Sequence, residues 1–273
     1  MRRPRARSRL KRAFTATDER AEAELDARLR GVQRVSRPLT VAFVGAKGGV
    51  GRTVCTAGVG ALLAERTSLR VLAIDVSRGR GTLSLILRPS RRSKEGATGL
   101  LEVLDDVSSA TSLRTFMSSH ASGLDVLAGP VPPDQLRPLV FVCQRFYDVI
   151  LLDTSGELGS RRVEAALSCS RGVVAITTPE RPAVMLTVQG LASMSTVLGV
   201  VLNRISDHVP AEPGRAVIAR RVRRPVWPLR DDPELAQMVN SGALGLAALP
   251  GDTRMDLLEI ATGVLDALEP AGR

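Results

Sequence analysis

The chain has 273 residues, of which 44% are hydrophobic and only 3% are aromatic. This length suits one α/β domain with extensions or at most two small domains, and an aliphatic core suits a parallel sheet that helices bury on both faces. No run of about 18 apolar residues occurs and none follows the basic N-terminus, so the sequence predicts neither a transmembrane segment nor a secretory signal. Three widely spaced cysteines, Cys55, Cys143 and Cys169, favour a reducing compartment over a disulfide or metal centre.

The net charge of +10 is concentrated near the N-terminus. Residues 1–37 hold twelve Arg and Lys residues against five Asp and Glu, and residues 1–12 hold seven positive charges and no acid. Such a block is typical of a disordered arm that binds DNA or another anionic surface, or of a tail that only aids solubility. We therefore divide the chain into a basic, partly disordered N-terminal extension, 1–37, and a globular domain, 38–273.

The elements expected along the chain alternate between helices and short apolar strands. A charged helix is expected at 17–30, before Pro38 closes the extension. Strands are then expected at 39–44, 69–74, 148–152, 172–176, 199–202 and 226–227, with a further apolar run at 124–127. Helices are expected at 51–66, 99–106, 133–146, 183–197, 214–222, 233–240 and 253–268. This alternation indicates parallel βαβ units and predicts a three-layer α/β/α fold with a mostly parallel sheet of about seven or eight strands.

The segment VAFVGAKGGVGRT, residues 41–53, has the composition of a phosphate-binding loop. An apolar strand leads into a glycine-rich loop, whose backbone N–H groups can turn inward around phosphate oxygens, and then into a helix whose N-terminus favours anions. Gly45 and Gly51 occupy the glycine positions of the pattern G-x-x-x-x-G-K-[ST], and Thr53 occupies the position whose hydroxyl binds Mg²⁺. Arg52 stands where that pattern has lysine.

The string A-K-G-G-V-G-R-T resembles the deviant Walker A motif, K-G-G-x-G-K-[ST], of the ParA/MinD family of P-loop ATPases. Further segments that resemble the family follow in the family's order, at 70–79, 147–156, 172–180, 199–205 and 225–242. The resemblance covers about residues 39–268. It implies the P-loop NTPase fold, ATP and Mg²⁺ as cofactors, and a homodimer that forms with nucleotide.

The resemblance also implies a role for each residue of the site. Catalytic roles fall to Lys47, which would reach the nucleotide of the partner subunit, and to Asp75, which would contact Mg²⁺ or its waters. Asp153 ends an apolar strand and would hold Mg²⁺ together with Thr53; the plainer alternative is a solvated turn aspartate. The residues expected to bind the nucleotide are Gly48, Gly49, Val50, Gly51, Arg52, Thr53 and, at the adenine base, Asn203, for which a strand-end turn is the alternative.

Two departures from the family pattern concern catalysis. Arg52 keeps the positive charge of the expected lysine, but its guanidinium is longer and planar. Ser77 replaces the second aspartate of the family's D-x-D switch, and a serine hydroxyl is a poor base near neutral pH. Ser155 and Gly156 also stand where the family has Pro-Pro after Asp-Thr. We therefore expect nucleotide binding to be kept and ATP hydrolysis to be weak or lost.

The sequence supports two functions. The first is an ATP-dependent dimerising switch of the ParA/MinD type, used in chromosome or plasmid partitioning or in cellular positioning. The alternative is a catalytically decayed scaffold that localises a pilus or secretion machine. Both imply a cytoplasmic protein with an unidentified protein partner, and nucleoid or membrane association through the basic arm is a candidate in either case. A cluster formed by Arg220, Arg221, Arg223 and Arg224 is either a solvated face or a non-specific DNA contact.

The segment 253–268 ends the predicted fold. Its apolar stripe includes Leu257, Leu258 and Leu265, and acids such as Asp256 and Glu259 lie beside it, without lysine or arginine in the stripe. Acidic charge opposes binding to an anionic membrane surface. We expect this helix to pack in the core.

Overall fold

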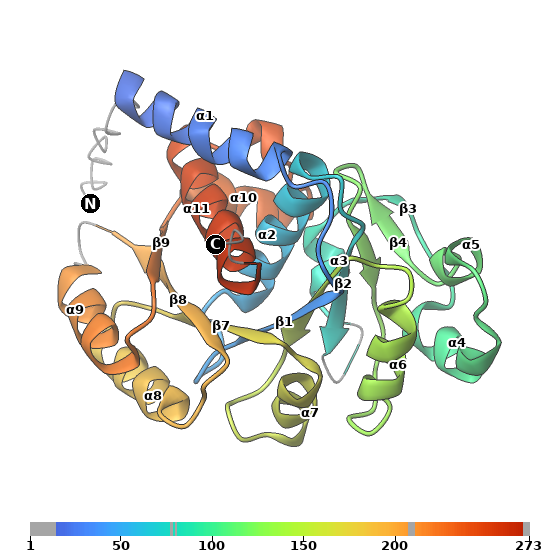
Figure 1. The fold of residues 1–273 in the computed structure, drawn as a ribbon. Helices are drawn as coiled ribbons and strands as arrows, with labels where there is room; N and C mark the ends of the chain where they lie inside the picture. The colour runs from blue at the N-terminus through green and yellow to red at the C-terminus, as the bar shows by residue number, and fades with distance from the viewer. Residues whose placement is uncertain (1–14, 77–78, 80, 207–210, 270–273) are drawn as a thin grey trace, which may run out of the picture.

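The computed structural model describes residues 15–76, 79, 81–206 and 211–269, which form one nine-stranded sheet between two layers of helices (Figure 1). In chain order, the strands are β1 (Leu39–Val44), β2 (Val71–Val76), β3 (Pro89–Arg91), β4 (Ser118–His120), β5 (Asp125–Leu127), β6 (Val149–Thr154), β7 (Gly172–Thr177), β8 (Val197–Ile205) and β9 (Val226–Arg230). Their order across the sheet is β3-β4-β5-β2-β6-β1-β7-β8-β9. The six strands β2, β6, β1, β7, β8 and β9 pair in parallel, as does β5 with β2, which confirms the mostly parallel α/β/α fold.

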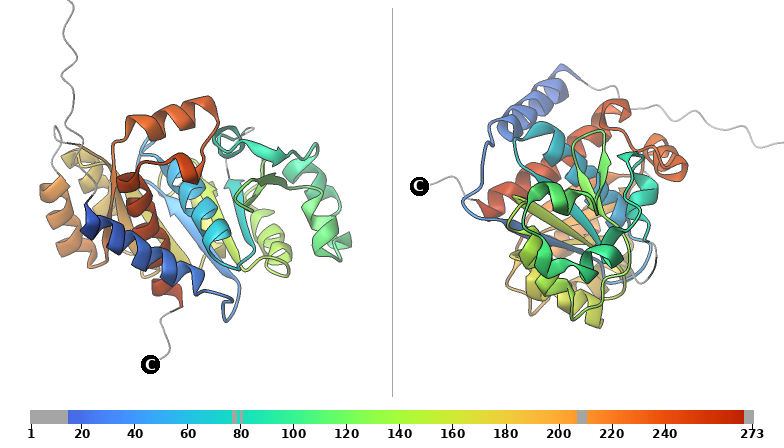
Figure 2. Two further views of the ribbon diagram at one scale, coloured as in Figure 1. Left: turned by 90° about the horizontal axis from the view of Figure 1, so that it is seen from above. Right: turned by 90° about the vertical axis from the view of Figure 1, so that its right-hand side faces the viewer.

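The helices cover both faces of the sheet (Figures 1 and 2). They are α1 (Ala16–Arg30), α2 (Arg52–Arg66), α3 (Leu83–Ile86), α4 (Gly96–Glu102), α5 (Ala110–Arg114), α6 (Leu136–Cys143), α7 (Arg161–Cys169), α8 (Arg181–Leu191), α9 (Ala211–Val222), α10 (Pro233–Ser241) and α11 (Gly251–Leu268), with short 3-10 turns η1 (Leu104–Asp106) and η2 (Leu246–Ala248). Helices α1, α2, α10 and α11 pack on one face, and α6 to α9 pack on the other. The final helix α11 packs in the core as expected.

Strand β1 shows why both faces of the sheet are apolar. All six of its residues are buried. Because side chains alternate along a strand, Val41 and Phe43 join the core under α2 and α11, while Ala42 and Val44 join the core under α6 to α9. A strand covered on both sides has no polar face, which is why the sequence shows a continuous apolar run there.

The sheet has nine strands, whereas the sequence predicted about seven or eight. The additions are β3 and β4, three-residue strands with the sequences PSR and SSH, and β4 pairs antiparallel with both β3 and β5. Neither has an apolar run, so hydrophobic patterning could not reveal them. Helices α3 and α5 are too short for a periodic signal, and α7 buries only Val163 and Ala166.

The predicted N-terminal helix is confirmed as α1, which packs on α2 and α11 at the outside of one helical layer (Figure 2). Leu29 is buried, and Arg28 pairs with Asp266 of α11 at 2.6 Å. A second ion pair joins Glu22 to Arg254. The described part of the extension is therefore packed on the globular domain. The basic arm, 1–12, lies outside the described residues, and its binding to DNA or an anionic surface stays a prediction.

Leu29→Ala should destabilise the protein by about 2–4 kcal/mol, because it removes a buried side chain and leaves a cavity between α1 and the core. Urea unfolding monitored by circular dichroism measures this change. Arg20→Ala, on the exposed side of the same helix, is the matched control and should shift stability by less than about 0.5 kcal/mol. Equal stabilities for the two variants would contradict the packing of α1 on the domain.

No helix in the described part of the chain has the length and apolar character needed to span a bilayer.

Candidate functional site

The candidate site lies where the parallel strands end at their carboxyl edge. The loop 45–51 follows β1, Asp75 is close to the end of β2, and Asp153 is close to the end of β6. The strand register aligns Phe43 with Asp153 and Asp75 with Asp153 across adjacent strands. Ligands of open α/β sheets bind at this edge. The structure thus brings together the loop and the two aspartates that the sequence predicted.

The loop is fixed by one buried side chain and one amide. Val50 is buried, and its carbonyl accepts a hydrogen bond from Asn203 Nδ2 at 2.7 Å. Gly51 has a φ of +93°, and a Cβ there would lie 2.1 Å from the same Asn203 nitrogen. Only glycine fits this backbone conformation and this close approach. Asn203 therefore holds the loop, and its contact with an adenine base stays a prediction.

The start of α2 has the features of an anion-binding surface. The helix begins at Arg52, and the first N–H groups of a helix have no partner within it. The first turn contains no acid, so nothing in it opposes the positive end of the helix dipole. Gly48 and Gly49 are exposed, and a Cβ at either would meet no atom within 4 Å. This surface is suited to phosphate oxygens.

Asp153 is a buried carboxylate whose bonding capacity is not filled. The residue is only 4% exposed, and its Oδ1 has no hydrogen-bond partner in the described part of the chain. Burial, together with the charge of Asp75, raises the pKa of Asp153 to about 7, although Thr53, Arg52 and Thr56 partly oppose the rise. A buried carboxylate of this kind needs a cation or a donor to be stable when ionised.

Asp75 is held by the segment that follows β2. Its Oδ2 accepts a hydrogen bond from the backbone N–H of Leu83 at 3.1 Å. Gly81 has a φ of +66°, and a Cβ there would lie 1.9 Å from the same oxygen. Thr82 Oγ1 lies 3.4 Å from Thr53 Oγ1, so the segment also reaches the start of α2. Ser77, which stands at the second position of the D-x-D switch, lies outside the described residues.

These residues fit Mg²⁺ bound together with a nucleotide. Among the described residues, no group of three or more His, Cys, Asp and Glu side chains could hold a metal without other ligands. Mg²⁺ in nucleotide sites commonly uses only one or two carboxylates, with phosphates and waters completing its shell. Asp153 with its unfilled oxygen and the Thr53 hydroxyl supply such ligands, and Asp75 lies beside them.

Arg52 lies across the site instead of pointing to solvent. Its Nη1 donates to the carbonyl of Gly45 at 3.4 Å and also to the carbonyl of Gly156. Burial lowers the pKa of Arg52, and the charge of Asp153 opposes that effect. The guanidinium thereby links the phosphate loop to the turn after β6. The guanidinium has further N–H groups, on Nε and Nη2, that can donate to an anion.

Lys47 is half-buried in the loop, beside the turn that precedes α8. The hydroxyl of Thr178 lowers the pKa of Glu180 most, and the charges of Lys47 and Arg204 lower it further. The ammonium group of Lys47 is therefore near an exposed carboxylate on its own chain. Its predicted role toward a partner's nucleotide is not tested by a single chain and stays a proposal.

Several residues of the site were missed by sequence reasoning. They are Thr56, which lies near Asp153, Gly81, whose missing side chain leaves room for Asp75, Leu83, whose N–H donates to Asp75, and Gly156, whose carbonyl accepts from Arg52. Thr56 follows Thr53 by three residues, a spacing that places both on one face of α2, so helical spacing could have indicated it. Leu83 and Gly156 make their contacts through backbone atoms, which any residue type supplies. Position 81 requires glycine, because a Cβ there would overlap the Asp75 carboxylate.

Comparison with known proteins agrees with this geometry. Residues 41–244 match the family described as the CobQ/CobB/MinD/ParA nucleotide binding domain. The ESX-1 secretion-associated protein EspI of Mycobacterium tuberculosis is 29% identical over 94% of this chain, which spans only 40% of EspI. The virulence plasmid ParA family protein pGP5-D of Chlamydia trachomatis is 26% identical, over 62% of this chain and 66% of that protein.

The fold is similar to that of solved structures. The septum site-determining protein MinD of Pyrococcus horikoshii, complexed with Mg-ADP, aligns with a TM-score of 0.66 and 22% identity. The alignment covers 82% of this chain and 95% of that one. Because the family match covers most of the chain and includes the phosphate loop, the chain belongs to the CobQ/CobB/MinD/ParA nucleotide-binding domain family.

Proposed function

We propose that the protein binds ATP with Mg²⁺ and dimerises in response, as a switch that positions a cellular cargo. The observation that carries this proposal is the unfilled, buried Oδ1 of Asp153 beside the glycine loop and the start of α2. A carboxylate oxygen that is buried without a partner costs stability, even where the other oxygen is hydrogen-bonded. A cation brought in with the nucleotide would supply that partner.

Each residue has a separate task in this proposal. The N–H groups at the start of α2 bind phosphate oxygens, and Arg52 adds charge beside them. Thr53 and Asp153 hold the Mg²⁺, which neutralises phosphate charge when bound. Asn203 keeps Val50, and so the loop, in its binding conformation. Lys47 would cross to the nucleotide of the second subunit, as the resemblance to the family implies.

A second candidate is a scaffold with little or no ATP hydrolysis that serves a secretion machine. Two observations favour it. The Arg52 guanidinium is held by backbone carbonyls of Gly45 and Gly156. The relative EspI, matched along 94% of this chain, is named as associated with ESX-1 secretion. The match covers only 40% of EspI, so the activity of the whole EspI protein does not transfer to this chain. The secretion machine and the protein partner are therefore part of this proposal. Both candidates require nucleotide binding and differ in turnover.

Calorimetry of the full chain with ATP tests the shared step. We expect binding that strengthens when Mg²⁺ is present, and Thr53→Ala should remove most of the Mg²⁺-dependent gain, because it deletes a metal ligand. The exposed Thr111→Ala is the matched control and should bind like the wild type. If the intact protein shows no affinity for ATP with or without Mg²⁺, the proposed switch is wrong.

A further inference from the structure

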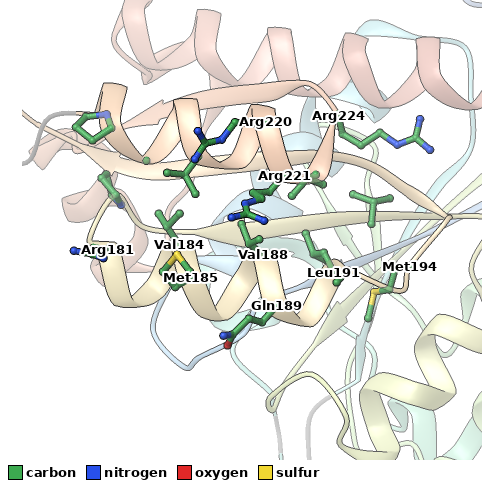
Figure 3. A pocket seen from close by; sticks show the side chains of 17 residues that line it. Arg181, Val184, Met185, Val188, Gln189, Leu191, Met194, Arg220, Arg221 and Arg224 are labelled. Carbon is green, nitrogen blue, oxygen red and sulfur yellow. The ribbon is translucent and has the colours of Figure 1, made fainter.

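One cavity in the described part of the chain shares no residue with the nucleotide site. It is a groove of about 810 Å³ between α8 and α9, shown with its lining side chains in Figure 3. Its apolar lining includes Val184, Val188, Leu191 and Val217. Met185 also lines it and is 41% exposed, so the groove opens to solvent. Nothing in the proposed function uses this groove.

The groove has a strongly positive rim. Its lining contains four arginines, Arg181 from α8 and Arg220, Arg221 and Arg224 at and after the end of α9, and no Asp or Glu (Figure 3). Arg224 donates to the carbonyl of Ser195. Within the described ranges, none of the four arginines forms a salt bridge. Between its ends α8 carries no acid, with Glu180 at its N-cap, and α9 carries one, Glu212, so the acids at the groove are fewer than the arginines. The four arginines therefore outnumber the two acids of these helices, and the rim keeps a net positive charge.

We infer that this groove binds an acidic amphipathic helix of a partner protein. An apolar groove between two helices accepts an amphipathic helix through anchors at i, i+3, i+4 and i+7. The eleven residues of α8 span roughly 16 Å, which corresponds to about three helical turns of an occupant. Flexible methionine side chains, such as Met185 and Met194, adapt to the anchors of such a helix. Acidic residues beside the stripe would meet the four arginines.

Other occupants match the groove less well. Duplex DNA would meet the arginines through its phosphates, but it has no apolar stripe to cover Val184, Val188 and Met185. The basic arm of the same chain, with seven positive charges in residues 1–12, would be repelled by the rim. The combination of an apolar lining and unbalanced positive charge is what favours an acidic, amphipathic partner over either of these.

The test uses a fluorescent synthetic helix and the full-length chain. The probe is a peptide of about 14 residues with Leu at i, i+3, i+4 and i+7 and Glu beside the stripe. The matched peptide keeps every Leu and replaces each Glu with Lys. Fluorescence anisotropy should show the Glu peptide binding at least about tenfold more tightly than the Lys peptide. Hydrogen exchange should show slower exchange in α8 and α9 when the Glu peptide is bound.

Variants on the rim locate the binding. The double change Arg220→Glu with Arg221→Glu should weaken the Glu peptide by about tenfold, and Met185→Glu should also weaken it. Arg215→Glu reverses the charge of a single arginine on α9, half the charge change of the double variant, but Arg215 does not line the groove and lies near Glu259. It should leave affinity within about twofold. Thermal melting confirms that each exposed-site variant is folded, and ATP calorimetry should give the same affinity in all of them.

Three results would overturn the inference. The first is failure of the wild type to bind the Glu peptide, and the second is equal binding of the Glu and Lys peptides. The third is loss of duplex DNA binding, but not of peptide binding, in the Arg220 and Arg221 double variant. That result would assign the arginines to nucleic acid. Because ATP affinity is measured on the same preparations, a failure here is distinguishable from a failure of the proposed nucleotide switch.

Discussion

Asp153→Asn should make the protein more stable in the absence of Mg²⁺ and should remove its Mg²⁺-dependent affinity for ATP. The stability gain arises because the buried Asp153 carboxylate is aligned with Asp75 on the neighbouring strand and has one oxygen without a partner. Asparagine has no charge to bury. The loss of affinity arises because an amide is a far weaker ligand for Mg²⁺ than a carboxylate.

The gain in stability should depend on pH. The pKa of Asp153 rises from 3.8 to about 7 on folding, so between these values the native state binds more protons than the unfolded state. The free energy of unfolding of the wild type therefore falls as pH rises through this window, and the loss is complete above about pH 7. At pH 8 the difference between Asp153→Asn and wild type should reach at most ~4 kcal/mol, and it should shrink toward pH 4.5.

Urea unfolding at pH 8 and at pH 4.5 without Mg²⁺, together with ATP calorimetry at pH 8 with Mg²⁺, measures both effects. Asp134→Asn, at an exposed position, is the control and should change neither quantity. A destabilised Asp153→Asn protein at pH 8 would show that the carboxylate has a structural role that asparagine cannot fill. The link between the unfilled oxygen and a metal would then be wrong.

The parts of the fold with continuous apolar runs were predictable from the sequence. Residues 39–44 were predicted as a strand and form β1, because a parallel strand buried on both faces has no polar residue to interrupt it. The loop 45–53 was predictable because glycines, a lysine and a threonine at fixed spacing have few other uses. The polar β3 and β4 were not predictable, since their pairing depends on backbone hydrogen bonds next to β5.

The limits at the site have a similar cause. Asp75 and Asp153 were placed correctly at strand ends, but their mutual alignment depends on the order of β2 and β6 in the sheet, which no local pattern contains. The contact of Arg52 with Gly156 joins residues 104 positions apart. Asn203 also contacts the loop from a distant strand, which periodicity cannot show. The sequence therefore predicted the chemical groups of the site, which depend on residue type. It did not predict the contacts between them, which depend on the order of the strands in the sheet.

The wild-type protein should hydrolyse ATP very slowly or not at all while still dimerising with ATP. The two steps rely on different residues. Dimerisation, as the family resemblance implies, needs the nucleotide and Lys47, which is present. Hydrolysis needs a water in line with the γ-phosphate and charge at the leaving oxygens. Ser77 offers a weak water-positioning group, and Arg52 is held by the carbonyls of Gly45 and Gly156.

Light scattering and a phosphate-release assay on the same preparations separate these steps. Lys47→Ala should abolish the ATP-dependent dimer without unfolding the chain. Arg52→Lys combined with Ser77→Asp should raise turnover by about 10²–10⁴-fold, the usual contribution of a positioned catalytic group, and should leave dimerisation intact. Because both positions would act on one γ-phosphate in this proposal, their effects should couple, so each change is also measured alone. Brisk hydrolysis by the wild type would mean that another residue positions the water. In that case neither Ser77 nor Arg52 limits the reaction, and the scaffold candidate loses its main support.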